Sequence, residues 1–128
     1  MRTEFDEANL PAGVVERAFR YGSEFAWSTE DIQDALRALG EARLAVLGID
    51  LWIVHRNEIY TSIPTEKGPG VWGTNTSARR REEPWPEYCR RTAEESIREI
   101  ISANLEELVD PEIRPFMHYL VTFTGEDA

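Results

Sequence analysis

The chain of 128 residues has very few cysteines and histidines, the side chains that form disulfides and most often hold zinc. Its single cysteine, Cys89, excludes a disulfide within the chain, and its two histidines, His55 and His118, are far apart in the sequence. This set does not have the spacing of a tetrahedral metal site. A phosphate-binding glycine loop, a dinucleotide fingerprint and a G-x-S-x-G motif are also missing. We therefore expect neither a metal nor a cofactor.

Long apolar runs and basic residues are scarce as well. No stretch approaches the roughly 20 apolar residues that a membrane-spanning helix needs, and the acidic N-terminus does not resemble a signal peptide. Against 24 acidic residues there are 14 basic ones, which gives a formal net charge of −10. Such a surface repels nucleic acid and anionic membranes and attracts basic partners. We expect a cytoplasmic protein that binds neither nucleic acid nor membrane, although this charge could serve solubility alone.

The clearest structural pattern in the sequence runs from Trp27 to Val54 and predicts a helix followed by a strand. Ser28 occupies the position of a helix N-cap, and Trp27 and Ile32 have the spacing of a hydrophobic staple. Gly40 is typical of the left-handed residue that ends a helix. This unit is a fold signal and says little about function.

The predicted strand over 44–54 has two different faces. One face is wholly aliphatic and suited to lie under helices, and it consists of Leu47, Ile49, Leu51 and Ile53. The other face contains Gly48, Asp50 and Trp52. A glycine in the middle of a strand indicates a bulge or the close approach of another group. Because burial of an unpaired charge is costly, Asp50 must be paired, hydrogen-bonded or open to water.

The remaining patterns predict a single domain over 1–128 of the α+β class. We expect a mobile arm over 1–12, a short helix over 13–21, a strand over 59–63, a long loop over 64–87, a helix over 88–108, a last strand over 116–123 and a tail over 124–128. Together they predict a small antiparallel or mixed sheet of three to four strands. Two main helices pack on one face of it, beside a short N-terminal helix. A loop of this length inside a compact domain is often functional.

Four stretches, taken together, resemble the immunity protein 40 family of bacterial immunity proteins. They are F-A-W-S-T-E-D-I-Q-D-A-L-R-A-L, A-V-L-G-I-D-L-W, the loop residue Trp72, and Y-C-R-R-T-A-E-E-S-I-R-E-I-I before a terminal apolar strand. The resemblance covers residues 25–123, and its most specific element is Leu47-Gly48-Ile49-Asp50. The chain departs from the family pattern at Ile49, where a second glycine is usual, in a longer loop around 68–81, and in an additional N-terminal helix.

The resemblance implies a non-catalytic inhibitor from a polymorphic toxin system. Such a protein binds a cognate toxin domain in the cytoplasm and blocks the active site or the folding of the toxin. We expect a basic toxin as the partner, and a monomer or a small homo-oligomer. Because hot spots in interfaces are commonly aromatic, the predicted partner-binding residues are aromatics with nearby carboxylates, namely Asp50, Trp52, Glu58, Tyr60 and Trp72.

Two other functions stay open at this point. The chain could be a small ligand-binding or hydrolytic domain with Asp50 in a pocket under the 64–87 loop, beside His55 or His118. His55 follows Asp50 by five residues and points to the other face of a regular strand, so that pairing requires a bulge. Alternatively, the chain could be a structural adaptor whose loop aromatics dock on a fixed assembly partner.

Overall fold

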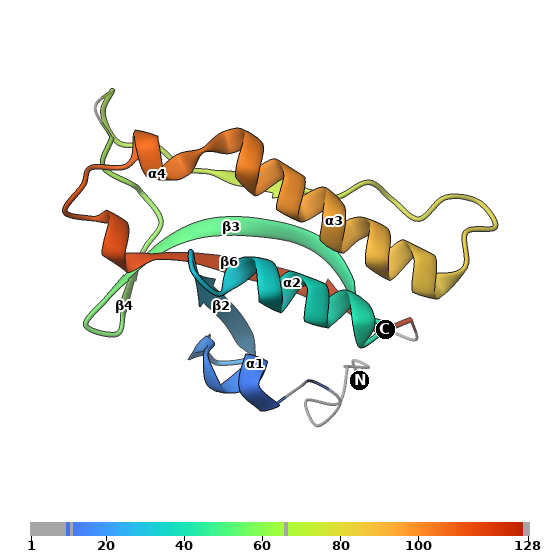
Figure 1. The fold of residues 1–128 in the computed structure, drawn as a ribbon. Coiled ribbons are helices and arrows are strands. Elements are labelled where there is room, and N and C mark those ends of the chain that lie inside the picture. Colours follow the sequence, from blue (N-terminus) through green and yellow to red (C-terminus); the bar gives the residue numbers. More distant parts are fainter. Residues whose placement is uncertain (1–9, 11, 66, 127–128) are drawn as a thin grey trace.

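A computed structural model describes residue 10, residues 12–65 and residues 67–126 of the chain (Figure 1). Its elements are, in order, α1 (Ala12–Glu16), β1 (Phe19–Tyr21), β2 (Glu24–Ser28), α2 (Ile32–Glu41), β3 (Ala45–His55), β4 (Glu58–Tyr60), β5 (Gly73–Asn75), α3 (Trp85–Ala103), α4 (Leu105–Leu108), the 3-10 helix η2 (Arg114–Phe116) and β6 (Met117–Thr124). The predicted arm over 1–12 lies outside the described residues except for Leu10, which is buried, and Ala12, which begins α1.

The described strands form one antiparallel sheet in the order β1-β2-β6-β3-β4, and β5 also pairs with β3. This confirms the predicted α+β class, but the sheet has six strands and not three to four. The additional strands come from segments with weak local signals. The segment 19–21 was expected to continue a helix, whereas it pairs with β2, which formed where no strand was predicted. The segment 73–75 lies inside the predicted loop and pairs with β3.

The main core lies between one face of the sheet and the helices α2 and α3, which run along the curved strands β3 and β6 in Figure 1. Its strand residues include Ile49, Leu51 and Ile53, as predicted. The two helices approach closely at Gly40. A Cβ atom at that position would lie 3.2 Å from the carbonyl oxygen of Cys89 and 3.2 Å from the Cβ of Ala93. The absence of a side chain at Gly40 is therefore what permits this packing.

The ends of α2 differ from those predicted. Asp31 and not Ser28 is the N-cap residue, and the Ser28 hydroxyl donates to the Asp31 carboxylate at 3.3 Å. Gly40 does not end the helix, because it lies inside the last turn at the contact with α3. The left-handed residue is Arg43, with φ of 63°. Arg43 and Leu44 donate their N–H groups to carbonyls of the last turn, in the pattern of a Schellman motif.

A β-bulge in β3 exchanges the predicted roles of two residues. The register with β6 shifts between Val46 and Gly48, so Leu47 is the additional residue and the alternation of side chains changes phase there. Val46 is fully buried in the core, whereas Leu47, which was predicted to face the helices, is 38% exposed. Gly48 also permits a close approach, because a Cβ atom there would lie 2.9 Å from the carbonyl oxygen of Thr74.

The predicted long helix over 88–108 consists of two helices in the structure. Asn104 adopts a left-handed conformation with φ of 46°, which separates α3 from α4. Two predicted core residues are exposed, Leu108 after this change of direction and Ile101 before it, inside α3. Ile101 is 61% exposed and Leu108 is 50% exposed, while Leu105 between them is buried. A continuous 3.6-residue period therefore gave the wrong environment for both.

The turn between β3 and β4 offers a site for stabilisation. Arg56 and Asn57 form a two-residue loop with positive φ values of 53° and 65°, as in a type I′ turn. Because Asn-Gly suits this turn best, the double variant Arg56→Asn/Asn57→Gly should be more stable by about 1 kcal/mol. Urea denaturation measures this difference, and a less stable variant would contradict the turn geometry.

Candidate functional site

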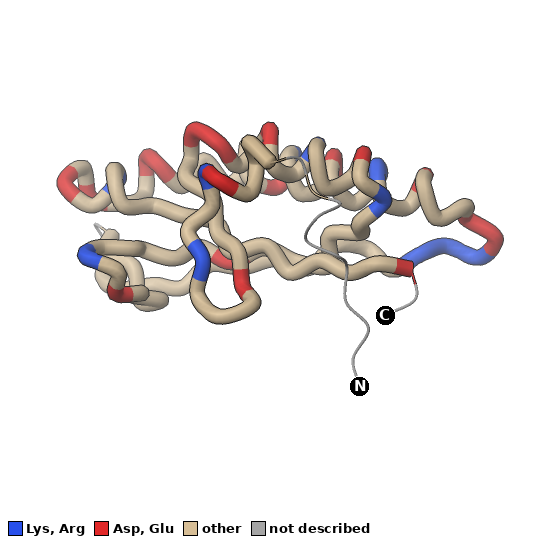
Figure 2. The backbone as a smooth tube through the Cα atoms, turned by 90° about the horizontal axis from the view of Figure 1, so that it is seen from below, with Lys and Arg blue, Asp and Glu red and all other residues tan. Residues whose placement is uncertain are grey.

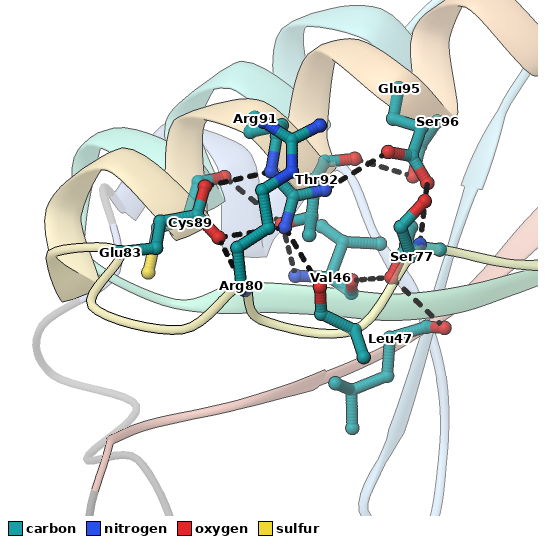
Figure 3. Close-up of polar contacts among 12 residues, drawn as sticks. Val46, Leu47, Ser77, Arg80, Glu83, Cys89, Arg91, Thr92, Glu95 and Ser96 are labelled. Atoms are coloured by element: carbon teal, nitrogen blue, oxygen red, sulfur yellow. Dashed lines mark hydrogen bonds and ion pairs between the residues drawn. The ribbon is translucent and has the colours of Figure 1, made fainter.

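The loop before α3 is fixed to the helix by the guanidinium group of Arg91 (Figure 3). Arg91 donates to both carboxylate oxygens of Glu83 at 2.7 and 2.8 Å, to Glu95 at 3.2 Å and to the carbonyl oxygen of Ala78 at 3.0 Å. The backbone N–H and the hydroxyl of Ser77 donate to Glu95 at 2.6 and 3.0 Å. These charged groups are paired with one another, so they hold the loop in place.

The basic stretch Arg79–Arg81 belongs to the same loop, and in Figure 2 it is followed directly by acidic residues. The Arg79 guanidinium lies 5.3 Å from the centre of the Trp85 ring and 3.5 Å from the carboxylate of Glu126. The backbone N–H of Arg80 donates to Glu83 at 2.9 Å. These contacts are local, within the loop and with the chain end near it, and the stretch does not stand out as an anion site.

The Arg91–Glu83 pair predicts a specific dependence of stability on pH. Chiefly through its hydrogen bond, Arg91 lowers the pKa of Glu83 from 4.5 to about 2. A carboxyl whose pKa is lowered by folding stabilises the protein above its unfolded pKa, and this contribution is lost as the pH falls toward the folded pKa. Between about pH 4.5 and about pH 2, wild type should therefore lose more stability than Glu83→Gln. Urea denaturation over this pH range measures the two slopes, with the exposed neighbour variant Glu82→Gln as the control. Equal slopes for wild type and Glu83→Gln would contradict the pairing.

Two of the predicted partner-binding residues lie on the sheet face opposite α2 and α3. Asp50 is exposed and lies between Gly73 of β5 and Leu120 of β6. Among the described residues, its carboxylate forms no hydrogen bond or ion pair, and partial burial raises its pKa above 3.8. Trp52 is only 8% exposed and packs with Ala26 and Leu120. Asp50 is thus the open carboxylate that the sequence allowed, beside an aromatic residue that is largely covered.

Neither histidine is bonded to Asp50 in the described part of the chain. His55 lies on the opposite face, as its position five residues later predicts, and its ring is 4.5 Å from that of Phe116. His118 pairs with Trp52 across the sheet and so lies on the face of Asp50. However, its Nδ1 is 3.0 Å from the carbonyl oxygen of Phe116.

The other three predicted residues lie on the side of the sheet that carries the helices. Glu58 pairs with His55 on the β3–β4 hairpin, and Tyr60 on the same short strand is 46% exposed. Trp72 is half-buried, and its ring meets that of Tyr119 edge-on at 6.2 Å between ring centres. The five predicted residues therefore do not form one continuous surface.

We call the end of the molecule that carries α4 and β4 the α4 end (Figure 1). Residues of α4, β4, η2 and their neighbours line three cavities. The hairpin cavity, of about 270 Å³, is lined by Ile53, His55, Tyr60, Ser62, Pro64, Ile113 and Phe116. The loop cavity, of about 120 Å³, is lined by Leu51, Ile63, Thr65, Gly70, Val71, Trp72, Leu105, Leu108 and Val109. The helix cavity, of about 280 Å³, is lined by Thr29, Ile32, Gln33, Ile100, Ile101, Asn104, Leu105, Glu106 and Tyr119. Asp50 lines none of these three.

Exposed apolar side chains gather around these cavities. Six large hydrophobic residues are exposed in the described part of the chain, and the four that line the cavities are Tyr60, Val71, Ile101 and Leu108. The segment 105–113 adds four carboxylates without a lysine or arginine, namely Glu106, Glu107, Asp110 and Glu112. The α4 end thus combines apolar anchoring positions with negative charge.

Sequence reasoning missed several residues of the α4 end. Phe116 and Ile113 line the hairpin cavity, yet Phe116 was assigned to a strand and Ile113 to no element. Glu106 lines the helix cavity, although the predicted helix made it one exposed charge among many. The dense run of carboxylates in 105–113 was the available signal, because no basic residue interrupts it before Arg114.

Comparisons with protein-family models, curated proteins and solved structures find no match to this chain. Among the described residues, none of the helices is both long and apolar enough to cross a membrane. The same part of the chain contains no cluster of three or more histidine, cysteine, aspartate or glutamate side chains that could hold a metal ion.

Proposed function

We propose that this protein is an immunity protein, which binds a cognate bacterial toxin domain in the cytoplasm and neutralises it without catalysis. The observation that carries the proposal is the α4 end, where four of the six exposed large hydrophobic residues line open cavities beside a run of carboxylates. The resemblance of residues 25–123 to immunity proteins supports it independently.

The chemistry of the α4 end suits a basic protein partner. The net charge of −10 speeds the encounter with a basic surface and disfavours acidic partners. The hairpin cavity can then take an apolar side chain of the toxin against Tyr60 and Phe116. Half-exposed tyrosines beside a cavity are typical interface hot spots, because they bury a large area with little loss of conformational freedom. Glu58, on the same strand as Tyr60, would contribute to the polar rim.

Co-expression tests this function directly. The toxin domain encoded next to this protein should stop growth of cells, and co-expression of the immunity protein should restore it. If the neighbouring gene encodes a toxin and this protein does not restore growth, the proposal is wrong. Recovery of a fixed assembly partner in place of a toxin would favour a structural adaptor.

Tyr60→Ala should weaken binding of the toxin domain by roughly tenfold or more, because truncation of a hot spot costs about 2 kcal/mol or more. Isothermal titration calorimetry with the purified toxin domain measures the loss. Tyr21→Ala is the matched control, since Tyr21 is 59% exposed but lies on β1, away from the three cavities. If the two variants bound the toxin domain with equal affinity, the hairpin cavity would not be part of the interface.

A further inference from the structure

The helix cavity differs from its two neighbours because its lining is largely polar. It lies between the start of α2 and the junction of α3 with α4, and Figure 1 shows both at the same end of the molecule. Its apolar wall consists of Ile32, Ile100, Ile101 and Leu105. The polar groups that line it are Thr29, Gln33, Asn104, Glu106 and Tyr119.

One hydroxyl group in the lining of this cavity is buried without a hydrogen-bond partner among the described residues. This group is the Oγ1 atom of Thr29. The side chain of Tyr119 also lines the cavity and is only 1% exposed, but its hydroxyl is not a fully buried, unpaired group as Thr29 Oγ1 is. Buried polar groups in folded proteins are normally hydrogen-bonded. A buried hydroxyl without a partner, in the lining of an open cavity, therefore indicates that a polar ligand group completes its bonding.

The charge in the cavity favours a cation. Among the described residues that line it, Glu106 is the only charged one, and none is a lysine or an arginine. Burial and the charge of Glu106 together raise the pKa of Tyr119 to about 12, so the phenol stays protonated at neutral pH. It can then accept a hydrogen bond from a ligand and donate its own to Glu106 or an amide oxygen.

The volume and the lining of the cavity favour a small ligand group that donates hydrogen bonds. A volume of about 280 Å³ is at the lower limit of small-molecule sites, which suits a side chain better than a nucleotide. A guanidinium group offers five N–H donors in one plane and no acceptor. It matches a cavity whose carboxylate, amide and hydroxyl oxygens can all accept, and the apolar wall can cover the methylene groups of an arginine side chain.

We propose that the helix cavity receives the guanidinium group of an arginine side chain of the partner protein. The identity of the partner rests on the proposed function, whereas recognition of the guanidinium rests on the cavity itself. Glu106 supplies the charge, and Tyr119 and Thr29 supply the acceptors that fix the orientation of the group. The aliphatic wall formed by Ile100 and Leu105 contacts its methylene stem.

An NMR titration with N-acetyl-arginine N-methylamide tests the cavity without the toxin. The probe should produce saturable shifts of backbone amides in 101–106, and its neutral isostere N-acetyl-citrulline N-methylamide should bind roughly tenfold more weakly. Glu106→Gln should weaken arginine binding by a similar factor while keeping the side-chain volume, and Tyr119→Phe should weaken it without unfolding the core. Glu107→Gln is the matched control, because it removes the same charge one residue away from the cavity lining.

Equal binding of the arginine and citrulline probes, or no saturable shift in 101–106, would overturn the proposal. A second measurement separates the possible sources of the guanidinium. In the complex with the toxin domain, Glu106→Gln should weaken affinity and Glu107→Gln should not. If the probe binds but Glu106→Gln leaves toxin affinity unchanged, the site serves a free guanidinium compound and the assignment to a protein partner is wrong. Failure of growth rescue with intact probe binding would instead overturn only the proposed function.

Discussion

Trp27→Ala should destabilise the protein by about 3–5 kcal/mol, the usual cost of removing a large aromatic side chain from a core. Trp27 is fully buried, and its ring is stacked on Phe25 with 5.9 Å between ring centres. Its indole N–H also donates to the carbonyl oxygen of Val14 at 2.9 Å. The residue therefore fills the core between β2 and α2 and attaches α1 to the sheet.

The conservative variant Trp27→Phe separates the two roles. It keeps most of the apolar volume but removes the hydrogen bond to Val14, so we expect a loss of about 1–2 kcal/mol. Urea denaturation gives both values, and hydrogen exchange in 12–16 reports whether α1 has loosened. If Trp27→Ala were no less stable than Trp27→Phe, the ring would not occupy the core as described.

Gly40→Leu should destabilise the protein by about 3 kcal/mol, at the upper end of the cost of overpacking a core. Any side chain at Gly40 meets the backbone of α3, since its Cβ atom would lie 3.2 Å from the carbonyl oxygen of Cys89. The helices would have to move apart, because a backbone carbonyl cannot rotate away as the end of a flexible side chain can.

Gly13→Leu is the matched control for Gly40→Leu. Gly13 also lies in a helix, α1, but a Cβ atom there would meet no other atom within 4 Å. This variant should be neutral or slightly stabilising, because leucine favours a helix more than glycine does. Similar losses in the two variants, measured by thermal denaturation, would show that the contact between α2 and α3 does not control stability.

Local sequence patterns predicted most of the elements, because each pattern acts within a few residues. The helix and strand of the stretch from Trp27 to Val54 form where the sequence placed them, although their ends differ. Gly40 shows why the ends of helices are harder to predict than the helices themselves. A glycine at the end of a helical pattern usually terminates the helix, but here it is needed for contact with α3, which lies about fifty residues later in the chain.

The bulge at Leu47 shows the same limit inside a strand. Its neighbour Gly48 indicated a bulge or a close contact, and both are present. The sequence could not say on which side of Gly48 the alternation changes, because this depends on the register with β6. The predicted aliphatic face was therefore right for Ile49 to Ile53 and wrong for Leu47.

The candidate site was only partly predictable. Tyr60 and Trp72 were chosen as aromatics with nearby carboxylates, and both line cavities at the α4 end. Asp50 was chosen for its unusual place in an apolar strand, and it lies on the opposite face of the sheet. Glu106 had no distinguishing local pattern, since its position in the helix cavity follows from the left-handed turn at Asn104.

The two ends of the molecule differ in a way that bears on function. At one end, Arg91 joins the 76–84 loop to α3 through Glu83 and Glu95, so the polar groups there are already paired. At the α4 end, the buried hydroxyl of Thr29 lacks a partner among the described residues and apolar side chains are exposed. A binding partner gains more free energy by contacting the α4 end, because it can form hydrogen bonds and apolar contacts that the fold itself does not supply there.

Hydrogen exchange of this protein, alone and saturated with the toxin domain encoded beside it, tests the central claim most directly. We predict that binding slows exchange in 53–64 and in 101–116, the segments around the three cavities, and leaves 76–84 unchanged. Slower exchange confined to 48–52 and 118–122, on the sheet face of Asp50, or confined to 76–84, would contradict the assignment of the interface to the α4 end.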